Sequence, residues 1–309
     1  MRELATRYYG TQMPQVTVIG DFVLDRYWHG SVTRTNPEAP GVVVNIQTQT
    51  EQLGGAGGVA VVADSLGLAV SCFGAVGNDK DGYELAQLIN EKSSGGSVIC
   101  WTQPQTTIKH RIVAGQQLLH NRFDFEEVSE LTATEANLLD TQHIGKVIVF
   151  ADYAKGVCSQ AVIEKALELA DARECFVIVD PARGRPLEEY GQVDLIKLNA
   201  AEAKAITGRG PADAAKQLSH EHTTTVVVTD GSDGMFVCDC ESFAHIPAKP
   251  SVVRDVTGAG DTVIAAIALG LVKEYSIQNT LELAAELAAQ QVSQLGVAAI
   301  GGLRNADRL

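Results

Sequence analysis

The sequence predicts an α/β protein with a mainly parallel central sheet between layers of helices. Short apolar, β-branched runs alternate with helical patterns along most of the 309 residues. Runs such as 147–150 are apolar throughout, as strands buried on both faces of a parallel sheet are. The runs also end repeatedly in small or polar residues, and ligands of open α/β sheets bind beyond such strand ends. These three observations favour a sheet that is covered on both faces.

The individual elements follow from the same alternation. Strands are predicted over residues 16–20, 70–76, 147–150, 176–180, 195–198 and 225–229. Helices are predicted over residues 55–66 and 81–91, and further helices are expected to begin near Ser159, Ala200 and Pro211. A strand–helix–strand order of this kind is typical of parallel sheets, because parallel neighbours need crossover connections.

Two stretches break this rhythm. Residues 27–50 and 106–124 alternate apolar and polar side chains with a period of two and show no helical pattern. That pattern predicts antiparallel strands added to the core, and we expect them to form a small lid over the site.

No Pro- or Ser-rich linker divides the chain, so one domain over residues 1–309 is expected. Open strand edges pair readily, so a homodimer through the lid is also expected.

Composition excludes some classes of function. A net charge of −14, without a basic patch, argues against a nucleic-acid partner. Residues 1–14 lack an apolar signal region. No segment approaches about 18 uninterrupted apolar residues, so no membrane span is expected. A protein of the cytoplasm that acts on small molecules fits this composition, in which hydrophobic residues make up 45% of the chain.

The sharpest local signal is segment 255–262, Asp-Val-Thr-Gly-Ala-Gly-Asp-Thr, which precedes an apolar helical run over 263–272. Thr257 is expected to cap that helix. Gly258-Ala259-Gly260 would then place free backbone N–H groups at the positive end of the helix dipole, which is a site for an anion such as phosphate.

Asp261 follows in the first turn, beside this anion hole. A carboxylate there can accept the proton of a substrate hydroxyl while that hydroxyl attacks a phosphoryl group. The alternative is a Gly-rich helix start with an acidic first turn, which stabilises helices in general.

Other nucleotide motifs are absent or weak. The chain has neither a P-loop nor the catalytic loop of protein kinases. Residues 55–60 fit G-x-G-x-x-A, with Asp79 about twenty residues on, as in a dinucleotide fingerprint. This segment, however, follows a polar stretch rather than a clean buried strand.

Polar residues follow five of the predicted strands, and each could also be an ordinary turn residue. They are Asp21, Asp152, Asp180, Asn199 and the pair Thr229-Asp230.

With these motifs in this order, the sequence resembles the ribokinase-like (PfkB-type) family of sugar kinases over nearly its whole length. The resemblance is carried by segment 255–262, by Gly54-Gly55 at a helix start, by Asn199-x-x-Glu202 and by Gly231-x-x-Gly234. It implies a ribokinase-like three-layer α/β/α fold with a small β lid. It also implies ATP and Mg²⁺, and in some relatives a monovalent cation near the Asp255 loop.

Within that family the chain is most similar to kinases that phosphorylate the anomeric hydroxyl of a heptose 7-phosphate. Segments 20–28, 34–40, 122–127 and 152–156 carry this likeness. In many bacteria such a kinase is fused to a nucleotidyltransferase, and this chain is too short to include that second domain. Only the kinase activity is therefore implied.

The resemblance implies roles for individual residues. Asp261 is the general base, with Gly258, Ala259 and Gly260 as the anion hole. Asn199 and Glu202 organise Mg²⁺ through water. Further nucleotide contacts are expected from Thr229, Gly231, Gly234 and Thr257. Substrate contacts are expected from Asp21, Asp25, Arg34, Gly54, Gly55, Arg122, Asp152 and Lys155. Of these, Asp25 would bind sugar hydroxyls, and Arg34, Arg122 and Lys155 a distal phosphate.

Two positions depart from the family pattern. Gly58 stands where relatives carry an asparagine that holds sugar hydroxyls, and Ala285 stands where many carry an asparagine beside the adenine. Two alternatives therefore stay open: a kinase of the same family for another sugar or a nucleoside, and a relic that binds a sugar or nucleotide without catalysis.

Overall fold

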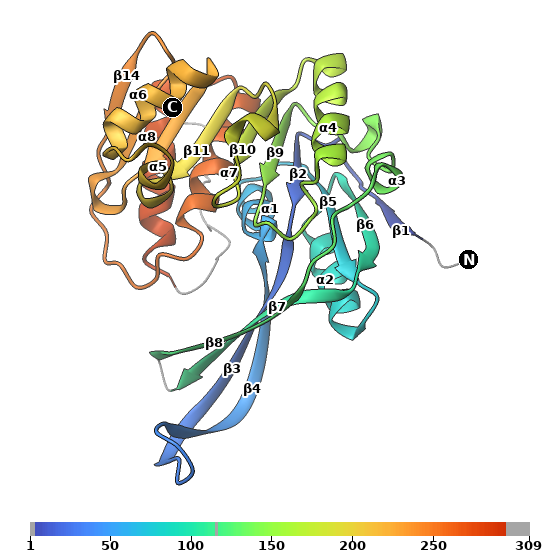
Figure 1. Ribbon diagram of the computed structural model, residues 1–309, viewed down its shortest axis with the longest axis vertical. Coiled ribbons are helices and arrows are strands. Elements are labelled where there is room, and N and C mark those ends of the chain that lie inside the picture. The colour runs from blue at the N-terminus through green and yellow to red at the C-terminus, as the bar shows by residue number, and fades with distance from the viewer. Residues whose placement is uncertain (1–3, 115–116, 295–309) are drawn as a thin grey trace.

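A ten-stranded sheet forms the centre of the computed structural model, which describes residues 4–114 and 117–294 (Figure 1). The strands lie in the order β1-β6-β5-β2-β9-β10-β11-β12-β13-β14. Their bounds are β1 Ala5–Tyr9, β2 Val16–Gly20, β5 Val70–Gly77, β6 Gly96–Gln103, β9 Val147–Ala151, β10 Phe176–Asp180, β11 Leu195–Asn199, β12 Thr225–Thr229, β13 Met235–Cys238 and β14 Phe243–Ile246.

The sheet is parallel from β6 to β12, whereas β1, β13 and β14 add antiparallel strands at its two edges. The prediction of a mainly parallel sheet is confirmed. The edge strands escaped prediction because short strands outside the β-α-β rhythm carry little periodic signal.

Helices cover both faces of this sheet. One face packs against α1 (Ala56–Ser65), α2 (Lys80–Glu91), α7 (Ala259–Val272) and α8 (Ile277–Gln291). The other packs against α3 (Ala133–Ala136), α4 (Gln160–Arg173), α5 (Ala200–Thr207) and α6 (Pro211–His222). Residues of β9 alternate between the two cores, Val147 and Val149 on the first and Ile148 and Phe150 on the second. The three-layer arrangement is therefore confirmed.

A second sheet of four strands extends away from this body, and we call it the projecting sheet (Figure 1). Its order is β4-β3-β7-β8, with β3 Phe22–Thr35, β4 Val42–Gly55, β7 Gln105–Ala114 and β8 Gln117–Glu127. The hairpins β3–β4 and β7–β8 are antiparallel, but β3 and β7 pair in parallel. The expectation of antiparallel strands alone was therefore wrong at this pair, because β2 and β6 run in the same direction and each continues outward into this sheet.

The chain reverses its winding between β2 and β9, which pair with Gly20 opposite Ala151. Strands earlier and later in the chain spread to opposite sides of this pair, which makes it a topological switch point. The fold therefore directs a ligand to the carboxyl ends of β2 and β9. Among the described residues, no helix is long and apolar enough to span a membrane.

Candidate active site

A pocket of about 650 Å³ opens beyond the carboxyl ends of the central strands. Its lining brings together nine of the residues singled out from the sequence: Asp152, Asp180, Asn199, Glu202, Thr229, Gly258, Ala259, Gly260 and Asp261. The lining also includes three residues that were given no role: Tyr153, Arg183 and Lys197.

The amino end of α7 points its first-turn N–H groups into this pocket. Gly258 precedes the helix with a φ of 77°, a left-handed conformation that glycine adopts without strain. No side chain caps the helix start. The Ala259 N–H donates to the Val256 carbonyl oxygen at 3.3 Å, and the rest of the helix start presents its positive end to an anion. The expected cap by Thr257 was wrong, because the Thr257 hydroxyl donates to Asp255 Oδ1 at 2.7 Å instead.

Asp261 lies in the first turn of α7 and is partly buried. The Tyr153 hydroxyl donates to its Oδ1 over 3.2 Å. Desolvation, with the nearby Asp180 carboxylate, raises the pKa of Asp261 to about 6, against the opposing effects of Lys197 and Tyr153. A carboxylate with this pKa is ionised at neutral pH and is a better proton acceptor than an exposed one.

Lys197 lies beneath the anion hole. Its Nζ is 3.1 Å from Asp180 Oδ1, and a Cβ built on Gly260 would lie 2.6 Å from that Nζ. The side chain is 7% exposed. Burial opposes its charge, yet Asp180 and Asp261 raise the pKa of Lys197 above its usual value. The site therefore holds a fixed ammonium group next to the helix N-terminus, where a phosphate would add negative charge.

The sequence signal for Lys197 was a single lysine inside the apolar strand 195–198. A long cation in a buried strand needs a partner, and here that partner is Asp180, on the neighbouring strand β10.

Asn199 and Glu202 form a reciprocal cap at the start of α5. The Asn199 side chain accepts from the Glu202 N–H, and Glu202 Oε2 accepts from the Asn199 N–H, each over 2.9 Å. This leaves the other Glu202 oxygen for the pocket. Among the described residues no group of three or more His, Cys, Asp or Glu could hold a metal. One free carboxylate oxygen suits Mg²⁺, which keeps several waters and binds through substrate phosphates.

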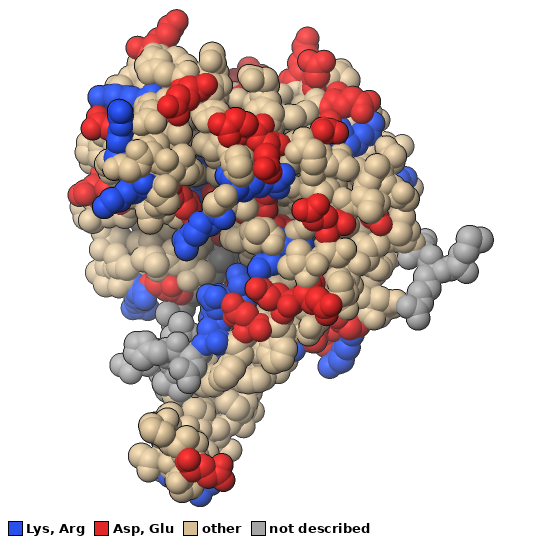
Figure 2. All heavy atoms as spheres, in the orientation of Figure 1, with Lys and Arg blue, Asp and Glu red and all other residues tan. Residues whose placement is uncertain are grey.

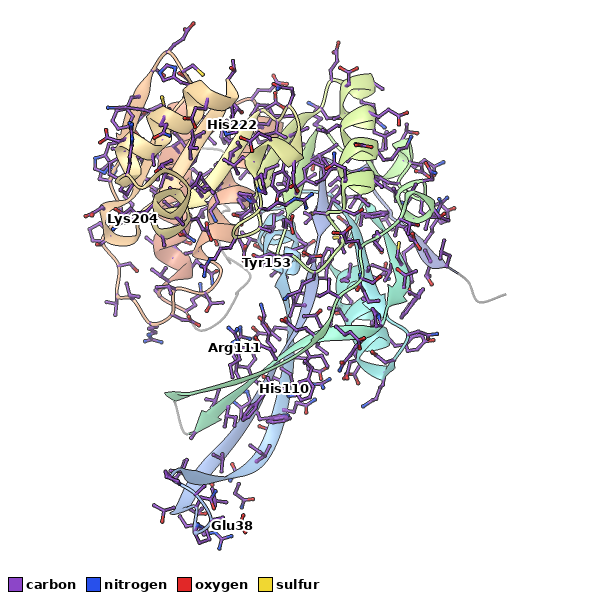
Figure 3. All side chains as sticks on the ribbon, viewed as in Figure 1. Glu38, His110, Arg111, Tyr153, Lys204 and His222 are labelled. Carbon is purple, nitrogen blue, oxygen red and sulfur yellow. The ribbon has the colours of Figure 1, made fainter. Side chains whose placement is uncertain are left out.

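Asp25 lies on β3, where the projecting sheet joins the body. It is 5% exposed, and its Oδ1 lies 2.6 Å from Arg111 Nη1 in an ion pair without hydrogen-bond alignment. A Cβ built on Gly54 would lie 2.7 Å from the Asp25 carboxyl carbon, so glycine is needed there. Arg111 lies on the side of the projecting sheet that faces Tyr153, and His110 lies on the other side (Figure 3).

The cations expected to bind a distal phosphate have different surroundings. Arg122 makes two 2.7 Å hydrogen bonds to Asp124, and Lys155 Nζ is 2.6 Å from Glu126. The Lys155–Glu126 pair joins the loop after β9 to β8. Basic and acidic side chains gather where the projecting sheet meets the body (Figure 2). Arg34 is exposed near the far end of β3, opposite Val43, so the structure does not bring it to the pocket.

Asp21 and Asp152 use their carboxylates within the fold. Asp21 accepts from the N–H groups of Tyr153, Lys155 and Val157, while burial raises its pKa to about 6. Asp152 binds the Tyr190 hydroxyl and Arg185. This geometry favours roles in holding the loop after β9 over the direct substrate contacts that were expected.

The other glycines that the sequence singled out shape turns of the chain. Gly55 precedes α1 with a φ of 58°, and Gly231 and Gly234 turn the chain between β12 and β13. A Cβ on Gly234 would meet the main chain of Pro247 and Ala248. Asp79 of the dinucleotide look-alike instead caps α2 by accepting from the Gly82 N–H, so it is occupied within the fold.

Comparisons with known proteins identify the family and the fold of the chain. Residues 13–301 match the model of the pfkB family carbohydrate kinases. Over 296 residues the chain is 37% identical to the bifunctional protein HldE of Caulobacter sp. (strain K31), covering 91% of this chain and 60% of that protein. It is 33% identical to HldE of Campylobacter jejuni (strain RM1221), covering 94% and 63%. The chain thus spans about three fifths of the length of these relatives.

Solved structures show the same fold. Phosphofructokinase-2 from Escherichia coli, in complex with potassium, superposes with a TM-score of 0.74 at 18% identity, covering 93% of this chain and 94% of that one. Arabidopsis thaliana ribokinase, complexed with ribose and ATP, superposes with a TM-score of 0.71 at 17% identity, covering 93% and 96%.

Proposed function

Because the chain belongs to the pfkB family of carbohydrate kinases, we propose that it transfers a phosphoryl group from ATP to the anomeric hydroxyl of a heptose 7-phosphate. The observation that carries this proposal is the Asp261 carboxylate at the amino end of α7, beside uncapped N–H groups and above the Lys197 ammonium. These are the parts that phosphoryl transfer needs: a proton acceptor, and donors for the transferring group.

In the proposed reaction the substrate hydroxyl oxygen attacks the γ-phosphorus of ATP. The bond from that phosphorus to its bridging oxygen breaks, ADP leaves, and Asp261 receives the hydroxyl proton. Tyr153 orients the carboxylate through its hydrogen bond. The N–H groups of α7 and Lys197 offset the charge on the transferring group, in a position fixed before the substrate arrives.

Mg²⁺, when bound, would neutralise charge on the ATP phosphates. Glu202 would hold it through water, because one of its oxygens is committed to the α5 cap and the other faces the pocket. Thr229 lines the same pocket. The turn of Gly231 and Gly234 follows it in the chain, so this side is proposed to receive the nucleotide. A monovalent cation near Asp255 stays a prediction.

The 7-phosphate is proposed to bind the basic face of the projecting sheet. Lys109 and Arg111 lie two residues apart on β7, and Arg122 lies opposite Arg111 on β8. The three side chains therefore share one face of the sheet. That face turns towards the body, since Lys109 Nζ lies 5.8 Å from the centre of the Tyr153 ring. A phosphate can displace the Asp124 carboxylate from Arg122, because guanidinium groups bind both anions in the same forked geometry.

The projecting sheet is proposed to close over the substrate as a lid, which would limit hydrolysis of ATP by water. It exposes Val32, Val42 and Ile46, each more than 40% accessible. We therefore keep the homodimer through this sheet as a proposal, which the mass of the protein in solution tests.

The function is tested by following ADP release from ATP with a panel of acceptors. Heptose 7-phosphate, the unphosphorylated heptose, ribose, fructose 6-phosphate and a nucleoside separate the candidates. Heptose 7-phosphate is expected to give the highest kcat/KM. A higher kcat/KM for another acceptor would change the proposed substrate but leave the proposed kinase activity in place. ATP binding without turnover of any acceptor would instead support the non-catalytic relic.

A further inference from the structure

Gly58 lies in the first turns of α1, where that helix packs against α7. Both helices belong to the same hydrophobic core, which includes Ala56 and Ala60 of α1 and Ile264 of α7. Small residues on α1 let the two backbones approach closely. The contact places the Asp261 carboxylate directly against the buried Gly58.

A side chain at position 58 would occupy the space that this carboxylate now fills. A Cβ built on Gly58 would lie 2.8 Å from Asp261 Cγ, and closer still to Oδ2. Carbon atoms in contact prefer about 3.5–4.0 Å, so the carboxylate would have to move by about 1 Å. The added Cβ would be attached to the backbone of α1, which is packed in the core. The Asp261 side chain is therefore the group that would move. Its route lies away from α1, into the pocket.

We propose that Gly58 is a positioning residue for Asp261: the missing side chain leaves the recess in which the base is held beside the reacting hydroxyl. The inference rests on the proposed function, because it explains how Asp261, the proposed base, is held in its position. The same device recurs four residues earlier, where Gly54 makes room for Asp25. An asparagine, the residue that the family pattern places at position 58, carries a Cβ and would require another position of the base.

The first test is a stability cycle that needs no ligand. It compares the wild type with the variants Gly58→Ala, Asp261→Ala and Gly58→Ala/Asp261→Ala by thermal unfolding. Gly58→Ala is expected to lower Tm while Asp261 is present, and to cost much less once the carboxylate is removed, since residues in contact are energetically coupled. If Gly58→Ala does not fold alone, recovery of folding in the double variant gives the same answer. An equal loss of stability in both backgrounds overturns the proposal.

The second test measures catalysis with ATP and heptose 7-phosphate. Gly58→Ala is expected to lower kcat about 10²-fold, the scale of a 1 Å misplacement, with little change in the KM for ATP. The wild-type kcat/KM should fall as the pH drops below about 6, where Asp261 takes up a proton and ceases to be a base. In Gly58→Ala the carboxylate moves towards solvent and its pKa falls, so this acid limb should shift to lower pH.

Gly210→Ala is the matched control, since a Cβ there meets nothing within 4 Å. It should leave kcat and the acid limb unchanged. If Gly58→Ala keeps the wild-type kcat and the acid limb of kcat/KM stays at the same pH, the positioning role of Gly58 is overturned, but the proposed function is not. If Asp261→Ala keeps full activity, the role of Asp261 as the base is overturned as well. The two variants therefore distinguish a failure of this inference from a failure of the proposed function.

Discussion

The pocket at the start of α7 and the face of the projecting sheet hold their charges in opposite ways. In the pocket, Lys197 is 7% exposed and pairs with Asp180 within a packed sheet. On the projecting sheet, the Arg122 side chain is 51% exposed and pairs with Asp124 two residues along the same strand. The first ammonium group cannot leave its place, whereas the second cation can change partners.

This contrast separates two kinds of contribution to a phosphoryl transfer. Fixed charges in a desolvated pocket stabilise the transition state without reorganisation, and their removal lowers kcat. Exposed charges on the projecting sheet are screened by water and salt. In the proposed function they bind the ground state and the transition state alike, so their removal should raise KM. Substitutions in the two regions should therefore change different kinetic constants.

The largest effect is expected for Asp261→Asn, which keeps the size of the side chain but removes the base. We expect kcat to fall by roughly 10²–10⁴, the usual contribution of a general base. ATP and sugar binding, measured by calorimetry, should change little. Asp213→Asn is the matched control, because Asp213 is an exposed acid in the first turn of α6. If both variants lose equal activity, Asp261 acts only by stabilising its helix through the dipole, as an acid in a first turn does in general.

Asp261 could be named as the candidate base from the sequence because the features that point to it are local. Segment 255–262 contains the turn, the helix start and the carboxylate together. The apolar strands were equally clear, since burial on both faces leaves a continuous run of apolar residues. The cap at Thr257 failed because a nearby carboxylate, Asp255, competes for the same hydroxyl.

What could not be predicted depends on contacts between distant parts of the chain. Lys197 meets Asp180 and Gly260 only when β10, β11 and α7 come together. Arg111 finds Asp25 through a parallel pairing of β3 with β7 that no local pattern specifies. Gly58 was noted as a departure from a family pattern, but its contact with Asp261 requires the packing of α1 on α7.

The next effect is expected for Lys197→Met, which preserves much of the volume and removes the charge. We expect kcat to fall by about 10², as for the loss of one donor to a developing anion, with the KM for the sugar nearly constant. Because Lys197 holds the pKa of Asp261 down, its loss should also raise that pKa. The acid limb of kcat/KM should then move to higher pH, the reverse of the shift expected for Gly58→Ala. A change in KM alone would contradict a fixed role in the transition state.

The smallest effect is expected on the projecting sheet. Arg122→Ala should raise the KM for heptose 7-phosphate by about 5- to 20-fold, the scale of one partly screened charge-assisted contact. It should leave the KM for the unphosphorylated heptose nearly unchanged, and kcat should stay close to wild type. Added salt should narrow the difference between the two substrates in the wild type but not in the variant. The exposed Arg209, which lies just after the carboxyl end of α5, provides the control Arg209→Ala.

An equal rise of KM for both heptoses would remove the phosphate-binding role of Arg122. A fall in kcat without a change in KM would break the comparison itself, because an exposed cation of the projecting sheet would then act in the transition state. That result would mean that the sheet closes until Arg122 is as desolvated as Lys197, since only a desolvated charge can lower the barrier by a comparable amount. The salt dependence decides between these cases, because a charge enclosed with the substrate loses its sensitivity to ions in the solution.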